Sequence, residues 1–158
     1  MLAVLHLPDL PPGSDEQPDP AFIADLYAGR AQYELCWPEI LAMAVRDGAA
    51  SVHYHPWRTN AVCDNVLAYV VGGTRFGLIP PTDDAGVALL AEARRLAAPG
   101  LLARLGARIS RVTVGRVRLI ASSGESDWCV VCWGRGRLAG VEFLRVAAIP
   151  TVAEAAPQ

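Results

Sequence analysis

The sequence predicts an α+β domain built on a mostly antiparallel sheet of about six strands, with two or three helices packed on one face. Two observations predict this class. Apolar residues recur at helical spacing in three segments, and they alternate with polar residues or form short apolar runs in about six others. The glycine pair Gly72-Gly73 separates two such runs as a tight β-turn does. The order helix, three strands, helix, three strands further suggests a duplicated αβββ unit.

Helices are expected where a capping residue precedes an apolar stripe. The first starts at Asp19-Pro20, where the carboxylate can accept bonds from free N–H groups, and continues through Tyr33. A second helix covers residues 38–47 and ends at Gly48, a residue suited to a left-handed C-cap. A third helix follows Thr82 and is expected to bury a stripe of four residues. These are Val87, Leu90, Ala91 and Leu96.

Strands are expected over residues 51–57, 66–71, 74–79, 111–121, 128–133 and 138–146. Between Arg111 and Ala121 the arginines change parity across Gly115, so a β-bulge there would turn all four apolar side chains inward. The run 128–133 is apolar on both parities, which predicts a central strand covered on both faces. Its Cys129 and Cys132 resemble a redox or metal spacing, but positions three apart in a strand point to opposite faces. We therefore expect both to be core residues.

The length of 158 residues suggests one domain, expected over 20–150, with a flexible Pro-rich acidic arm over 1–19 and a frayed tail over 151–158. All 14 basic residues are arginines, which excludes Walker-A, Schiff-base and pyridoxal-phosphate chemistries that need a lysine. The net charge of −2 combines −8 over residues 1–92 with +6 over residues 93–158. Either the halves neutralise one another or the arginine-rich half binds an anion.

The expected compartment is the cytoplasm. The N-terminal residues lack the basic-then-apolar pattern of a signal peptide, and the longest strongly apolar run, 66–71, is far too short to span a bilayer. Without an export signal, the four cysteines are expected to be reduced thiols. No membrane partner is therefore expected.

One candidate site is a transition-metal centre at His53 and His55. Two side chains at i and i+2 of a strand share a face, and two imidazoles there can converge on zinc or another transition metal. Cys63, Asp64 or His6 could complete such a site. The competing interpretation is a solvated strand face, and the expectation is that no cofactor is required.

A second candidate site is an arginine-rich β-meander that could bind an anion or a nucleic acid. Arginine forks bind phosphate, and the nearby tryptophans could stack on bases. The residues concerned are Arg111, Arg116, Arg118, Arg135 and Arg137. The competing interpretation is that they are the solvated outer positions of the meander.

No catalytic constellation assembles along the sequence, which favours a non-enzymatic interaction or ligand-binding domain. Small sheets leave edge strands and faces that dimerisation can cover, so a homodimer is expected. The alternatives are a metal-dependent enzyme using the His-x-His site and nucleic-acid binding through the arginine-rich meander.

Overall fold

A computed structural model describes residues 2–10, 36–55, 66–78, 83–98, 100, 105, 112–134 and 139–147. The described part of the chain contains two long helices and seven strands. In chain order the elements are β1 (Ala3–His6), α2 (Trp37–Arg46), β2 (Ser51–His55), β3 (Val66–Val71), β4 (Thr74–Leu78), α3 (Asp83–Ala97), β5 (Val112–Ala121), β6 (Gly124–Trp133) and β7 (Gly140–Arg145). The helix expected from Asp19 to Tyr33 and the tail 151–158 lie outside the described residues.

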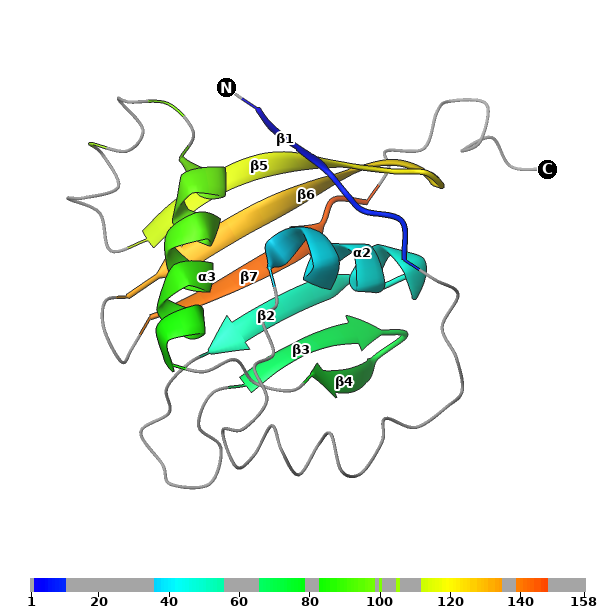
Figure 1. Cartoon of the computed structure of the whole chain (residues 1–158), viewed down its shortest axis with the longest axis horizontal. Coiled ribbons are helices and arrows are strands. Elements are labelled where there is room, and N and C mark those ends of the chain that lie inside the picture. The colour runs from blue at the N-terminus through cyan, green and yellow to red at the C-terminus, as the bar shows by residue number, and fades with distance from the viewer. Residues whose placement is uncertain are drawn as a thin grey trace, which may run out of the picture.

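The strands form one mixed sheet in the order β1-β5-β6-β7-β2-β3-β4. Each helix is followed by a three-stranded antiparallel meander, and the two meanders join where β7 pairs with β2 (Figure 1). This confirms the α+β class. The count of six strands was wrong, because residues 3–6 of the expected arm pair in parallel with β5 as a seventh strand. An internal duplication stays a prediction.

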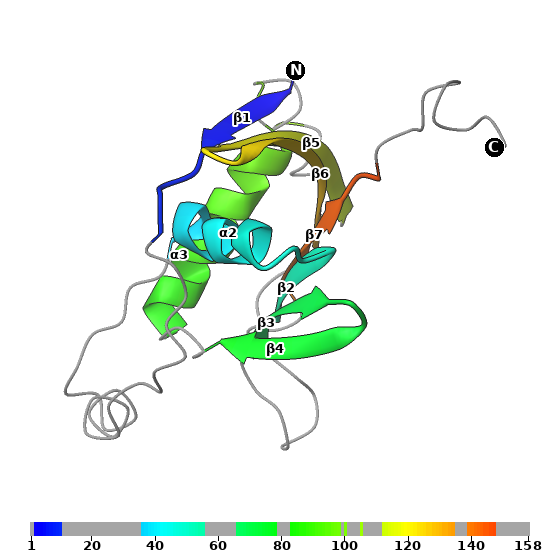
Figure 2. The same ribbon diagram turned by 90° about the vertical axis from the view of Figure 1, so that its right-hand side faces the viewer.

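Both helices lie on the concave side of the curved sheet, as Figure 2 shows. Neither α2 nor α3, the long helices of the described segments, has the length and apolar character that a membrane crossing requires. The sheet face that points away from them is called the open face below. The fold therefore has two layers, and the open face is the side that no described helix covers.

Trp37 joins the two layers at the centre of the core. Its side chain is fully buried, and its indole N–H donates a 2.7 Å hydrogen bond to the Leu89 carbonyl in α3. Its ring also packs on Phe143 of β7, with the ring centroids 4.7 Å apart. A buried indole N–H without a partner would cost about 1–3 kcal/mol, so this bond fixes α2 against α3.

The turns at two glycine sites form as the sequence predicts. Gly48 adopts a φ of 73° just after α2, and the amide of Ala49 donates to the carbonyl of Ala44. This is the hydrogen-bond pattern of a Schellman C-cap. Gly72 and Gly73 both have positive φ, as a type I′ hairpin turn requires. These positions set where α2 ends and where β3 reverses into β4.

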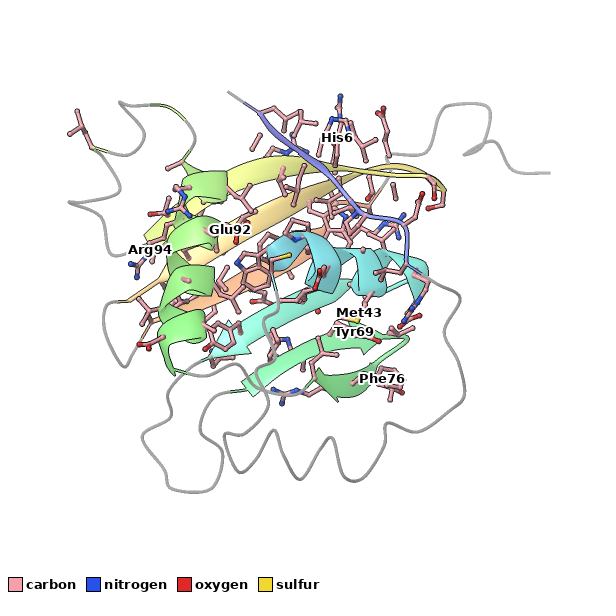
Figure 3. All side chains as sticks on the ribbon, viewed as in Figure 1. His6, Met43, Tyr69, Phe76, Glu92 and Arg94 are labelled. Carbon is pink, nitrogen blue, oxygen red and sulfur yellow. The ribbon has the colours of Figure 1, made fainter. Side chains whose placement is uncertain are left out.

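Tyr69 of β3 ties the sheet to the end of α2. Its hydroxyl donates to the Asp47 carboxylate, which also accepts from Arg46. Burial and this hydrogen bond raise the pKa of Tyr69 to about 12. Figure 3 shows Tyr69 beside Met43, and its ring stacks on Phe76 of β4 with the centroids 5.8 Å apart. Helix α2, β3 and β4 are thereby held together.

The buried stripe of α3 matches the expected one only in part. Leu90 is buried as expected and Ala91 and Leu96 are half-buried. Val87 is 68 % exposed, whereas Leu89 and Ala93 are buried. The helix instead turns small residues to the sheet: Tyr54 packs directly on Gly86, which leaves no room for a side chain there. Close approach of the backbone thus determined the orientation of α3, and the larger Val87 was left on the outside.

Gly115 does not form a bulge. The β5–β6 ladder runs from Val112↔Trp133 to Ala121↔Gly124 without interruption, so the expectation that a bulge turns Val112 and Val114 inward was wrong. A Cβ at position 115 would overlap the carbonyl of Ala97, the last residue of α3. Glycine is therefore required here for close helix–sheet packing.

This contact predicts that Gly115→Ala destabilises the protein by about 2 kcal/mol or more, because the added methyl group meets rigid backbone. Gly77→Ala on β4 is the matched control, since nothing lies within 4 Å of a Cβ at that position. Its free energy of unfolding should stay within about 0.5 kcal/mol of the parent value. Urea unfolding followed by circular dichroism measures both, and equal effects would contradict the close contact.

Candidate functional site

The open face combines exposed apolar side chains with aromatic and charged ones. Residues in register across strands share a face, so the ladders define its rows. One row runs Val112, Trp133, Gly140 and His55, and the next runs Val114, Val131, Glu142 and His53. A third runs Arg116, Cys129, Leu144 and Ser51. The candidate functional site is this set of three rows across β5, β6, β7 and β2.

The apolar part of the face is unusually exposed for valines in a sheet. Val114 is 61 % exposed and Val112 is 49 % exposed, and Leu144 of β7 is 38 % exposed. On the opposite face Val117, Leu119 and Val130 are fully buried under the helices. The expectation that β6 is covered on both faces was therefore wrong, because its outward residues are only half-buried.

An aromatic cluster lies at the β2 side of the site. His53 and His55 have ring centroids 5.6 Å apart, and those of His55 and Trp133 are 5.3 Å apart. Gly140 lies between β6 and β2, and a Cβ there would come within 2.5 Å of the Trp133 ring and 3.1 Å of His55 Nδ1. The missing side chain at Gly140 thus allows Trp133 to lie against the backbone beside His55.

The structure brings together two of the five residues considered for a metal site, and His6 lies on β1, which three strands separate from β2. His53 and His55 are neighbours on the open face, while Cys63 and Asp64 lie outside the described residues. Within the described segments, no group of three or more His, Cys, Asp and Glu side chains is arranged to hold a metal ion. The described chain therefore offers two adjacent imidazoles for a metal.

Two of the five predicted anion-binding arginines are described. Arg116 and Arg118 share the open face of β5, while Arg111, Arg135 and Arg137 lie outside the described side chains. Arg118 donates a 3.0 Å hydrogen bond to Asp127 of β6, which lowers the pKa of that carboxyl. The charge of Arg118 is thus already compensated by a neighbour on the same face.

Cys129 and Cys132 point to opposite faces of β6, as predicted, but the expectation that both are core residues is confirmed only for Cys132 and was wrong for Cys129. Cys132 is buried towards the helices, whereas Cys129 is half-exposed on the open face, so the two sulfurs do not face one another. Burial raises the pKa of the Cys132 thiol to about 11. Cys36 is exposed at the N-cap of α2.

Thiol labelling should separate these positions. At pH 8, iodoacetamide is expected to modify Cys36 rapidly and Cys132 only when the protein unfolds, because the thiolate is the reactive form and a pKa of about 11 leaves about 100-fold less of it than the ordinary value. Peptide mass spectrometry distinguishes the sites, and urea-unfolded protein is the control. Similar rates for both cysteines in folded protein would contradict the burial of Cys132.

Sequence reasoning missed Glu142 and Leu144 as members of this site, because both were treated as ordinary positions of a returning strand. Trp133 was considered only as a stacking residue beside the arginines, and its contact with His55 was not predicted. Side chains alternate between the two faces along a strand. The odd spacing of Trp133 from Val130, and of Glu142 and Leu144 from Phe143, could therefore have placed them on the open face. A comparison with protein-family models and a search of curated proteins both find no match for this sequence.

Proposed function

We propose that the protein is a non-enzymatic interaction domain that forms a homodimer through the open face. The observation that carries the proposal is the pair Val112 and Val114, which are 49 % and 61 % exposed beside Trp133 and Val131 on the side of the sheet that no described helix covers. Exposed apolar patches of this kind mark interaction surfaces. Burying them against a second apolar sheet face would be favourable.

The arrangement of charge on the open face supports a second copy of the chain as the occupant. Arg116 on β5 and Glu142 on β7 flank β6 on opposite sides. A two-fold axis running along β6 would place β5 of one copy over β7 of the other. Arg116 of each copy would then come within reach of Glu142 of its partner, which is the reciprocal pairing of an isologous interface.

The size of the sheet is also suitable. Seven strands spaced by about 4.8 Å make a face about 30 Å wide. A standard protein–protein interface buries about 800 Å² on each partner, which corresponds to a patch of similar width. Two twisted sheets can pack face to face at about −30° with their side chains interdigitated. Because the helices occupy the concave side, the open face is convex (Figure 2), and the contact would centre on β6 and the strands beside it.

We predict that Val114→Glu weakens self-association at least about tenfold, because the interface would then bury an unpaired carboxylate. Val87→Glu is the matched control: Val87 is equally apolar and 68 % exposed, but it lies on α3 at the other face. Sedimentation velocity over a concentration series measures the dissociation constant of each variant. A monomer at all concentrations, or equal effects of the two substitutions, would overturn the proposal.

A charge-reversal series tests the occupant more specifically. Arg116→Glu and Glu142→Arg should each weaken the dimer, and the double variant should recover most of the loss, because the reciprocal pairs are restored with opposite sign. Thermal unfolding checks that each variant is folded. If the parent protein instead binds single-stranded oligonucleotide at low salt and Arg116→Glu abolishes that binding, the face serves nucleic acid and the dimer proposal fails.

A further inference from the structure

We propose that His53 and His55 form a binding site for a late first-row divalent transition-metal ion, such as Zn²⁺, Ni²⁺ or Cu²⁺. The site belongs to a single chain and lies on β2 at the margin of the face proposed for dimerisation. Strand geometry places both imidazoles on the same face of the sheet, and the ladder pairs His53 with Glu142 of β7. Imidazole nitrogen is a preferred ligand of these ions.

The spacing of the two rings fits a shared ion. A metal–nitrogen bond of about 2.0–2.1 Å puts each ring centre about 3 Å from the ion, so two rings at a tetrahedral angle lie about 5 Å apart. The observed centroid separation is 5.6 Å, with the ring planes inclined by 52°. The observed separation is thus within about 1 Å of the value that a shared ion requires.

The neighbours of the pair favour a defined site over two independent histidines. Trp133 packs on one side of His55, with the ring centroids 5.3 Å apart, and this contact limits the rotation of the imidazole. Fixing one ring lowers the entropy lost when both rings bind. With two protein ligands the ion keeps coordination positions open, so it would be exchangeable and able to accept a donor atom from a further ligand.

The site can be tested by titration with metal salts alone. Isothermal titration calorimetry with Zn²⁺ at pH 7.5 should show one ion bound per chain, and Mg²⁺ at the same concentration should not compete because it prefers oxygen ligands. His53→Gln and His55→Gln should each weaken binding at least about tenfold, since the second imidazole binds intramolecularly once the first is engaged. His6→Gln is the matched control because His6 lies exposed on β1, and it should bind as the parent does.

Fluorescence gives a second, local readout. The measurement uses a Trp57→Phe background, because Trp57 follows His55 by two residues in the sequence and lies outside the described residues. A Cu²⁺ ion held by His55 should then quench Trp133, whereas Trp37 and Trp128 are buried on the helix side. Trp133→Phe should lose most of the quenched signal and retain Zn²⁺ binding. Equal losses in His6→Gln and His53→Gln, or no stoichiometric uptake by the parent, would overturn the site. Repeating the titration on Val114→Glu separates the two proposals, because metal uptake should persist when self-association is weakened.

Discussion

The burial of Trp37 is the interaction on which the rest of the arrangement depends. One indole bonds to the backbone of α3 and packs on Phe143 of β7, so it fixes both helices on the same side of the sheet. Once that side is filled, every second residue of β5 to β7 must point to the other side. The open face follows from this one-sided packing, because the same strands that bury Val117 and Val130 must present Val114 and Val131 outward.

Local signals in the sequence predicted most of the elements. The cap at Gly48, the hairpin at Gly72-Gly73 and the start of α3 just after Thr82 all follow from chemistry within a few residues, and the structure has them as expected. The opposed faces of Cys129 and Cys132 follow from strand periodicity alone. The α+β class could therefore be derived without knowledge of the tertiary contacts.

What the sequence could not provide was contact between distant segments. The parity change at Gly115 is compatible with a bulge or with close approach of another backbone, and only the position of Ala97 distinguishes them. Similarly, the burial of Leu89 in place of Val87 depends on how near Gly86 comes to Tyr54. The pairing of His53 with Glu142 and the contact of Trp133 with His55 join segments that are far apart in the chain, so the candidate site could be only half predicted.

The junction between β2 and β7 also has a consequence for how the chain folds. The strands within each meander are adjacent in sequence. Val52 of β2 and Phe143 of β7 are far apart in sequence, yet they pair in the β2–β7 ladder. Local ladders form quickly and distant ones slowly, so the two meanders should gain structure before they dock. Trp37 belongs to the first half and packs on Phe143 of the second. A change in Trp37 fluorescence during refolding would therefore report when the two halves dock, and not when either half forms.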